Sequence, residues 1–356
     1  KNILIICGEA SGDLNAANLA QRIIEKDPGL KISGVGGNYL RQAQVEVFYD
    51  IKDLAVIGFF DVLRKLPKFL TLRKILLQKI ESEKPDLIIL VDFSGFNLRI
   101  AKLITKSIPA FYYISPQVWA SRPGRIKTIR KFISKMIVLF KFEEEFYRLH
   151  GINVDFVGHP LLGTVKPKME KKDFLAQFDL DESKTTLALL PGSRKAEIKY
   201  ILPVMLKAAK LIRKSLNNLQ FIIAKVPNVD LYIYNRIMRK FALDIKIIED
   251  KTYDCLNIAD FCWVASGTAT LEAAILKKPM LIIYKMNLLN YLLYRPQVKL
   301  PYIGMVNIVV KRKIIPEFIQ FKAQPEKIAD ATIKIITNKP RLEQMEVALT
   351  EVKSSL

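Results

Sequence analysis

The feature that most constrains the fold is a regular alternation of short apolar runs with helical patterns along the chain. Residues 2–7 (NILIIC) form a continuous apolar run, which is typical of a strand that is covered on both faces of a sheet. Apolar residues then recur at helical spacing over 16–24. The strand signal returns at 31–37, 87–93, 110–115 and 135–140. This alternation predicts parallel sheets with crossover helices.

A second series of strand signals begins further along the chain, at 185–194, 219–225, 244–250, 260–266 and 279–284. Between the two series, residues 157–174 are rich in Gly, Pro and Lys, as expected for a linker. A chain of 356 residues is also too long for one ordinary core. We therefore predict an α/β fold of two doubly wound domains that face a cleft. The expected boundaries are 1–164, 165–336 and a last helical segment, 337–356, that returns to the first domain or to a partner subunit.

Charge and composition narrow the class of partner. The chain has 56 basic and 35 acidic residues, a net charge of +21, which favours nucleic acid, a phosphorylated ligand or an anionic lipid surface. A general preference for surface lysine explains the excess equally well.

Three cysteines without paired spacing and two histidines form no zinc pattern. No apolar run reaches the roughly 20 residues of a spanning helix, and the first residues run straight into a strand, so we expect a reduced, cytoplasmic protein without a signal peptide.

The loop at 189–198 (LLPGSRKAEI) directly follows an apolar strand signal. Gly192 and Ser193 permit close approach to the backbone, and Arg194 offers a fork of donors that suits phosphate oxygens. The start of a helix also attracts anions through its free N–H groups and its dipole. Taken alone, the loop also fits an ordinary connection between a strand and a helix.

A second loop, SGTATLE (266–272), opens a later helix of the same predicted domain. The amides of Ser266, Gly267 and Thr268 are placed to face phosphate, and the Glu272 carboxylate, about a turn inside the helix, could receive both hydroxyls of a ribose. A helix start that packs only against its own domain needs a single capping residue, and a plain cap remains the alternative. Two such loops in one domain predict a site for a nucleoside diphosphate.

Seven motifs occur in an order that is highly specific: GEASGD, VDFSGFN, YYISPQVWASRPGRI, VGHPLL, LLPGSRKAEI, SGTATLEAA and PEFIQ. From residue 2 to about 336 the chain resembles the lipid-A-disaccharide synthase family. The resemblance implies two Rossmann-like domains in the GT-B architecture, at the cytoplasmic face of the inner membrane. It also implies an inverting transfer from UDP-2,3-diacylglucosamine to 2,3-diacylglucosamine 1-phosphate, which gives a β(1→6) disaccharide and UDP.

The same resemblance assigns residues to the two substrates. The second domain would hold UDP, and Asn307 and Gln320 would complete the wall formed by the two loops described above. Ser11 and Asn97 lie in motifs of the first domain and would contact the acceptor. Arg122 and Arg125 lie among aromatic residues and would meet the acceptor's 1-phosphate, although buried packing explains the aromatic residues equally well.

Formation of a glycosidic bond with inversion needs a base that deprotonates the acceptor's 6-hydroxyl. Asp92 ends one apolar run of the first domain, and Glu9 lies just beyond another. We predict Asp92 as the base, with Glu9 as the group that orients the acceptor sugar or as the second candidate. Each residue also fits the role of a turn or capping residue.

Metal-dependent transferases neutralise the leaving diphosphate with a cation, often held by an Asp-x-Asp pair. Asp179 and Asp181 have this spacing, but they lie in a polar turn before a strand signal, and we assign them to solvent. Arg194 and helix dipoles can offset the charge instead. We therefore predict no metal requirement and no cofactor.

The segment 59–80 mixes large apolar residues with several cations. Apolar residues on more than one side of the predicted helix suggest shallow insertion into an anionic membrane, with Phe59, Phe60 and Phe69 in contact with lipid. An amphipathic core helix with a solvated basic face is the alternative. The apolar segment 287–308 lines the cleft, touches lipid or packs between subunits, and the sequence leaves these open.

Two other functions remain as rivals. One is a different UDP-sugar-dependent GT-B enzyme of cell-envelope synthesis, and the other is a basic nucleic-acid-binding protein. No RNA-binding aromatic signature or recognition-helix pattern supports the second. The expected partners are therefore the two acylated sugars and an anionic membrane surface, without nucleic acid, and the resemblance is compatible with a homodimer.

Overall fold

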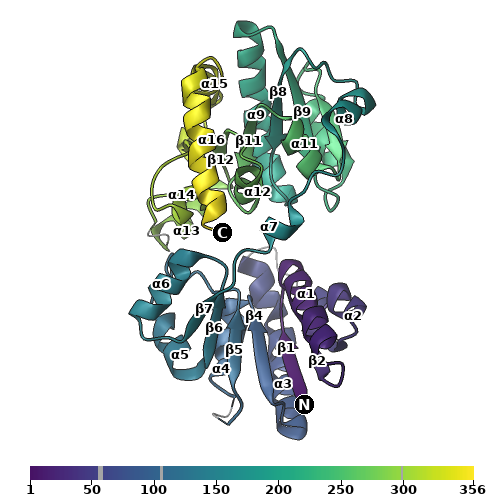
Figure 1. The fold of residues 1–356 in the computed structure, drawn as a ribbon, viewed down its shortest axis with the longest axis vertical. Helices are drawn as coiled ribbons and strands as arrows, with labels where there is room; N and C mark the ends of the chain where they lie inside the picture. The colour runs from purple at the N-terminus through teal and green to yellow at the C-terminus, as the bar shows by residue number, and fades with distance from the viewer. Residues whose placement is uncertain (55–58, 105–106, 298–299) are drawn as a thin grey trace. The chain divides into compact units, whose positions relative to one another are not determined.

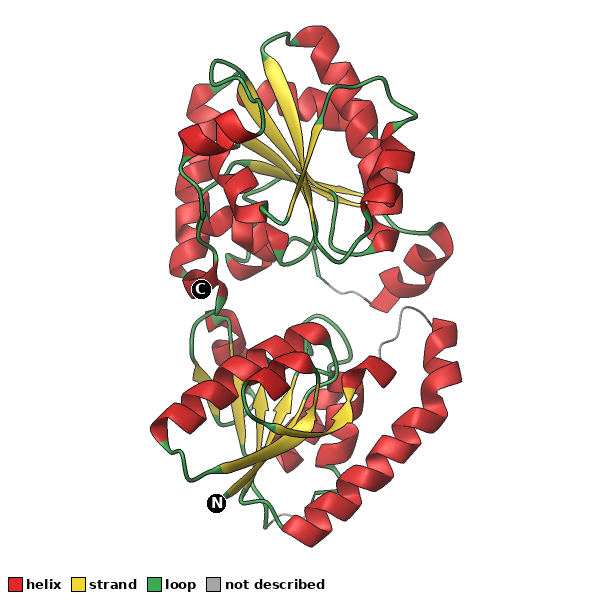
Figure 2. Ribbon diagram, turned by 90° about the vertical axis from the view of Figure 1, so that its right-hand side faces the viewer, coloured by secondary structure: helices red, strands yellow, loops and turns green. Residues whose placement is uncertain are grey.

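The computed structural model describes residues 1–54, 59–104, 107–297 and 300–356, without the side chains of residues 53, 59–65, 294 and 297. The chain divides into two compact units, Lys1–Gly158 (unit 1) and His159–Leu356 (unit 2). In each unit a sheet of parallel strands lies between helices, drawn in yellow and red in Figure 2. The predicted pair of doubly wound α/β domains is therefore confirmed.

Unit 1 contains, among the described residues, a seven-stranded parallel sheet in the order β3-β2-β1-β4-β5-β6-β7. Its strands are β1 (Asn2–Ile6), β2 (Lys31–Gly36), β3 (Glu46–Asp50), β4 (Leu87–Val91), β5 (Ala110–Tyr113), β6 (Lys135–Val138) and β7 (Val154–Phe156). Its helices are α1 (Ala10–Lys26), α2 (Asn38–Gln42), η1 (Ile51–Asp53), α3 (Phe59–Glu83), α4 (Ser94–Ala101), α5 (Arg125–Phe132) and α6 (Lys141–Leu149).

Unit 2 contains, within the part that the structure describes, a six-stranded parallel sheet in the order β10-β9-β8-β11-β12-β13. Its strands are β8 (Thr185–Leu190), β9 (Leu219–Lys225), β10 (Lys246–Glu249), β11 (Phe261–Ala265), β12 (Met280–Tyr284) and β13 (Glu317–Ile319). Its helices are α7 (Leu161–Thr164), α8 (Lys171–Gln177), α9 (Lys195–Ser215), α10 (Leu231–Met238), α11 (Thr252–Ile258), α12 (Ala269–Ile275), α13 (Leu288–Tyr294), η2 (Arg295–Gln297), α14 (Met305–Val309), η3 (Gln320–Lys322), α15 (Pro325–Ile336) and α16 (Lys339–Ser354).

The order of strands places one reversal point in each sheet. In unit 1, β1 pairs with both β2 and β4, so the chain first builds the sheet in one direction and then in the other. In unit 2, β8 pairs in the same way with β9 and β11. Ligands of doubly wound sheets bind outside the carboxyl ends of the strands at such a point. The loops after β1, β4, β8 and β11 are therefore the places to look for a site.

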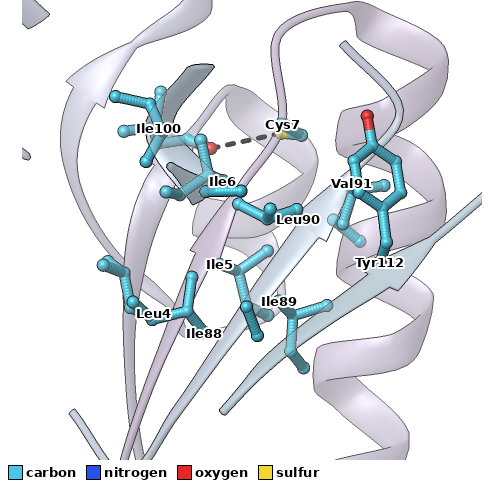
Figure 3. Close-up of a cluster of buried hydrophobic side chains, with 14 of the residues drawn as sticks. Leu4, Ile5, Ile6, Cys7, Ile88, Ile89, Leu90, Val91, Ile100 and Tyr112 are labelled. Carbon is cyan, nitrogen blue, oxygen red and sulfur yellow. Dashed lines mark hydrogen bonds between the residues drawn. The ribbon is translucent and has the colours of Figure 1, made fainter. Parts of the chain in front are cut away.

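The core of unit 1 is centred on β1 and β4. Leu4, Ile5 and Ile6 of β1 are buried, as are the residues of β4 from Ile88 to Val91 (Figure 3). The continuous apolar runs follow from this position, because helices cover both faces of the sheet and no residue of these central strands needs to face water. The core therefore fixes the strand ends at which the loops begin.

The division between the units falls at Gly158, six residues before the predicted boundary at 164. The last segment also belongs to unit 2, where α16 packs against α12, α14 and α15. The backbone N–H of His159 donates to the carbonyl of Leu356, 2.7 Å away, and so joins the two ends of this unit. Across the described residues, no helix combines the length and the apolar character needed to cross a bilayer.

Candidate functional site

A cavity of about 510 Å³ opens in unit 2 at the carboxyl ends of the central strands. It is lined by residues that follow β8, β9, β10 and β11 and by the segment just before α8. Seven of the nine residues that the sequence assigned to a nucleotide lie on its wall: Gly192, Ser193, Arg194, Ser266, Gly267, Thr268 and Glu272. The structure thus brings both predicted loops to one cavity.

The first loop is closed by a carboxylate that the sequence analysis did not single out. Glu197, in the first turn of α9, accepts hydrogen bonds from the backbone N–H groups of Ser193 and Arg194, at 2.9 and 3.2 Å. Gly192 has a φ of 121°, and a Cβ atom there would lie 2.5 Å from a carboxylate oxygen of Glu197. The loop therefore requires glycine at this position. The Arg194 side chain remains largely exposed at the cavity.

The second loop begins α12 without a side-chain cap. Thr268 is the N-cap residue, and its side chain makes no capping hydrogen bond. Gly267, with a φ of 152°, makes the turn that leads into the helix. Behind it, Glu272 is mostly buried beside Tyr253, and burial raises the pKa of its carboxyl group. The helix start and the carboxylate therefore both face the same cavity, as a phosphate and a ribose would require.

Three lysines of the cavity wall were missed by the sequence analysis. Lys166 and Lys168 come from the segment before α8, and Lys251 comes from the loop after β10. Asp254, buried in α11, holds this segment in place by accepting from the backbone N–H groups of Lys168 and Met169, at 2.6 and 2.9 Å. With Arg194, the three lysines give the wall four cations that can meet a diphosphate, beside the carboxylates of Glu197, Asp250, Asp254 and Glu272.

Asn307 and Gln320, the other two predicted nucleotide contacts, are not among the residues that line the cavity. Both are buried and hydrogen-bonded within unit 2. The Asn307 side chain donates to the carbonyl of Ile315 and to Glu317, each at 2.8 Å. The Gln320 side chain exchanges two hydrogen bonds with the backbone of Met286, each at 3.1 Å. These amides brace the loops after β12 and before β13.

In unit 1 the loop after β4 has an unusual backbone. Asp92 and Phe93 both adopt a left-handed conformation, with φ of 48° and 46°, although neither is glycine. The Asn97 side chain donates to the carbonyls of Ile6, Val91 and Asp92, at 3.2, 3.2 and 3.0 Å. The Tyr112 hydroxyl also donates to the carbonyl of Asp92. Strain of this kind persists only where the surroundings enforce it, and here the hydrogen bonds from Asn97 and Tyr112 do so.

The two predicted carboxylates lie close enough for their charges to interact. Burial, and then the nearby charge of Glu9, raise the pKa of Asp92 to about 6, against a backbone hydrogen bond from Phe93 that lowers it. Glu9 itself is exposed just after β1. A carboxylate with a pKa of about 6 is mostly ionised at neutral pH and basic enough to accept a proton.

An aromatic cluster packs beneath this loop. The ring of Phe93 stacks on Phe96 at 5.2 Å, and Phe69 of α3 lies 6.0 Å from each of them. A Cβ atom on Gly8 would lie 2.2 Å from the Phe93 ring, so only glycine fits there. Phe69 is therefore partly buried against the core instead of free to meet lipid.

The predicted acceptor residues are divided between the surface and the interior. Ser11 is exposed at the start of α1, whereas Asn97 is fully buried and acts on the loop backbone. The Arg125 guanidinium donates to the Ser94 hydroxyl at 3.0 Å. Burial lowers the pKa of Arg125, and the charges of Arg122 and Arg99 lower it further, so these three cations lie near one another.

A second buried carboxylate supports the loop between β5 and α5. Glu143 of α6 accepts from the indole N–H of Trp119 at 3.0 Å. Burial raises its pKa to about 7, against hydrogen bonds from Trp119 and Ser115 that lower it. The loop also contains two non-glycine residues with positive φ, Ile114 and Arg122. Glu143 therefore ties this loop to α6 through Trp119.

Other candidate residues lie away from both clusters. Asp179 and Asp181 sit in an exposed turn, where they pair with Lys246 and Lys184. The described residues contain no group of three or more His, Cys, Asp or Glu side chains placed to hold a metal. The side chains of Phe59 and Phe60 lie outside the described part, although their backbone begins α3.

The comparisons with known proteins agree with the motifs. The family model described as lipid-A-disaccharide synthetase matches residues 3–356. The chain belongs to this family. It is 41% identical to the lipid-A-disaccharide synthase of Syntrophus aciditrophicus, over 100% of this chain and 94% of that protein. It is 37% identical to the synthase of Geobacter sulfurreducens, over 99% and 92%. The predicted family, and with it a glycosyltransferase of lipid A synthesis, is confirmed.

Solved structures share the fold at low identity. A UDP-GlcNAc 2-epimerase from Neisseria meningitidis bound to UDP-GlcNAc superposes with a TM-score of 0.63 at 12% identity, over 97% of this chain and 94% of that one. The MurG protein of Acinetobacter baumannii superposes with a TM-score of 0.57 at 13% identity, over 99% and 95%. These likenesses confirm the predicted GT-B fold of two parallel-sheet α/β domains.

Proposed function

We propose that this chain transfers a 2,3-diacylglucosamine unit from UDP to the 6-hydroxyl of 2,3-diacylglucosamine 1-phosphate, with inversion. The match to one family over residues 3–356 carries the proposal. The cavity of unit 2 supports it, because it combines two glycine turns, four cations and a buried carboxylate at the reversal point of a doubly wound sheet.

The donor's UDP would occupy the cavity of unit 2. Arg194 and the lysines offset the charge of the diphosphate, and the start of α12 faces a phosphate. Glu272 accepts hydrogen bonds from the ribose hydroxyls. The same cations stabilise the negative charge that develops on UDP as it leaves.

On the acceptor side, Asp92 would act as the base. Its carboxylate takes the proton of the 6-hydroxyl as the oxygen forms a bond to the anomeric carbon, and the bond from that carbon to the diphosphate oxygen breaks to release UDP. Glu9 orients the acceptor sugar. The cations Arg99, Arg122 and Arg125 receive the 1-phosphate, since their mutual repulsion favours a bound anion. The proposal requires the two units to act on the same pair of substrates.

The acylated substrates place the reaction at an anionic membrane surface, the cytoplasmic face of the inner membrane, and α3 is the proposed contact. Leu72, Leu76 and Ile80 bury one face of this helix in the core. Leu66 and Leu70 are exposed one turn apart, next to the exposed cations Arg73 and Lys74. Helices with this arrangement lie at bilayer surfaces. A homodimer would extend the same surface over two copies.

The decisive experiment incubates the protein with both acylated glucosamines and identifies the product by mass spectrometry. A tetra-acylated disaccharide 1-phosphate, with one UDP released per product, supports the proposal. Unacylated UDP-N-acetylglucosamine serves as the competing donor. Equal turnover with that donor would contradict the proposed substrate and favour another UDP-sugar transferase.

A further inference from the structure

Unit 2 carries a group of exposed apolar side chains that neither the cavity nor the core uses. The group, called here the α13 patch, comprises Leu288, Leu289, Leu292 and Leu293 of α13 and Phe321 of η3 (Figure 1 labels α13). Their exposed fractions are 48, 75, 58, 52 and 63%. Leu288 and Leu292 are four residues apart, as are Leu289 and Leu293, so the leucines share one helix face.

Local contacts hold these leucines outward. The side chain of Asn287 caps α13 by accepting from the N–H of Leu289 at 2.9 Å, and it donates to the hydroxyl of Tyr200 at 3.3 Å. The ring of Tyr291 also meets Phe321 edge-on at 5.9 Å, which holds Phe321 beside α13. A fixed helix that exposes a contiguous apolar face marks an interaction surface.

The charged residues around the patch favour a partner with anionic groups. Residues 273–316 contain no Asp or Glu, whereas Lys285 and Arg295 flank α13 and Lys322 follows Phe321. The next acidic residue, Glu317, is occupied by the backbone N–H groups of Ile303 and Gly304. The partner must therefore offer an apolar region to the leucines and anionic groups to the surrounding cations, as a bilayer with anionic head groups does.

A second copy of the chain fits this surface poorly. Each copy has a net charge of +21, so two α13 patches would bring cations together without acidic residues between them. None of the five patch residues lines the nucleotide cavity, so a nucleotide held there does not cover them. An anionic lipid surface is the occupant that satisfies both the leucines and the lysines.

We propose that the α13 patch is a membrane-contact surface of the nucleotide-binding unit, which binds anionic lipid independently of α3. The strand before α13, β12, pairs with β11, whose end leads into the loop Ser266–Thr268. The patch thus begins at the same sheet edge as the donor cavity. This position links the patch to the proposed function, on which the identity of the lipid-linked substrate rests.

The test compares binding to vesicles for the full chain and its variants. The double variant Leu289→Ser, Leu292→Ser is expected to bind phosphatidylglycerol vesicles about tenfold more weakly at physiological salt. Val347→Ser is the matched control, because Val347 is 72% exposed on α16 of the same unit but stands outside the patch. A second variant, Lys285→Gln with Lys322→Gln, is expected to lose most of its preference for phosphatidylglycerol over phosphatidylcholine.

Three further measurements keep the outcomes separate. Affinity for UDP and the melting temperature should be unchanged in the leucine variant, and so should turnover of detergent-dispersed substrates. Unaltered vesicle binding by that variant would overturn the inference, as would a loss of self-association in its place. Absence of product from the wild-type chain would instead overturn the proposed function and leave the vesicle result standing.

Discussion

The two sheets share one strand order over six strands, but the loops at their reversal points differ in backbone conformation and in charged groups. After β8 and β11 the turns use glycine, and the walls carry Arg194 and lysines around an open cavity. After β4 the turn uses two non-glycine residues with positive φ, Asp92 and Phe93, and the Phe93 ring stacks on Phe96. We infer that one edge receives the diphosphate and that the other holds the base.

In the proposed mechanism, the difference between the two loops follows from what nucleotide binding and proton transfer each require. A nucleoside diphosphate needs many donors and an open approach, which glycine turns and long cationic side chains provide. A base needs a fixed direction and a raised pKa, which burial and a strained backbone provide. Fold alone therefore does not assign the roles of the two units, and the side chains at the strand ends do.

The largest expected effect tests the role of Asp92. Asp92→Asn keeps the shape but removes the base, so kcat should fall about 10³-fold while the affinity for UDP stays within twofold. Steady-state kinetics and calorimetry measure the two. Asp86→Asn, at the opposite end of β4, is the matched control. Nearly normal turnover by Asp92→Asn would exclude this residue as the base.

Substitution of Arg194 tests the cavity at the sheet edge of unit 2. Arg194→Ala should weaken UDP binding roughly 10- to 100-fold, because it removes a charge-assisted contact to the diphosphate. Arg213→Ala, at the other end of α9, should leave the dissociation constant unchanged. If both variants bound UDP equally well, the cavity would not be the diphosphate site.

Substitution of Glu272 tests the proposed ribose contact within the same cavity. Glu272→Gln should weaken binding of UDP about tenfold, and binding of 2′-deoxy-UDP less, because the carboxylate accepts from the ribose hydroxyls. Glu326→Gln, in the first turn of α15, serves as the control. An equal loss for both nucleotides would place the carboxylate elsewhere on the ligand.

The pH profile separates the two carboxylates of unit 1. Since Asp92 has a pKa of about 6, kcat/KM should fall as the pH drops through that value. Glu9→Gln removes the charge that adds to the effect of burial, so the acidic limb should move to lower pH by a fraction of a unit. An unmoved limb would show that Glu9 does not act on the titrating group.

The smallest effect concerns stability. Burial raises the pKa of Asp92 in the folded chain above its ordinary value of 3.8, so ionisation between that value and about 6 destabilises the fold as the pH rises. Asp92→Asn should therefore melt about 2–4 °C higher than the wild type at pH 8 and show no gain at pH 3.5. A lower melting temperature at pH 8 would contradict the assigned cause of the shift.

The central strands were predictable because burial on both faces leaves continuous apolar runs, as in β1 and β4. Three edge strands were not predicted: β3, with the sequence EVFYD, carries charged residues at its ends, and β7 and β13 have three residues each. The fourth edge strand, β10, was predicted from the apolar pair in its sequence KIIE. The predicted boundary at 164 lies six residues after the division at Gly158, because the Gly- and Pro-rich linker continues into α7.

The site was predictable where glycine or a hydroxyl marked a turn, as at Gly192 and Thr268. Lys166 and Lys251 were missed because 56 basic residues give no single lysine a local signal. Asn307 and Gln320 were assigned to the ligand, but their partners lie on segments that only the folded chain brings near. An amide in a motif does not reveal whether it meets a substrate or another loop.

The carbonyl of Asp92 is gripped from two sides, by Asn97 and by Tyr112, and Asn97 also ties the ends of β1 and β4 together. The backbone that carries the Asp92 side chain is thus fixed by the interior, before any ligand binds. In the proposed mechanism, a substitution that shifts the backbone of Ile6 or Val91 would slow proton transfer in a protein that still folds. Packing of the core would then limit the rate of catalysis as well as the stability of this unit.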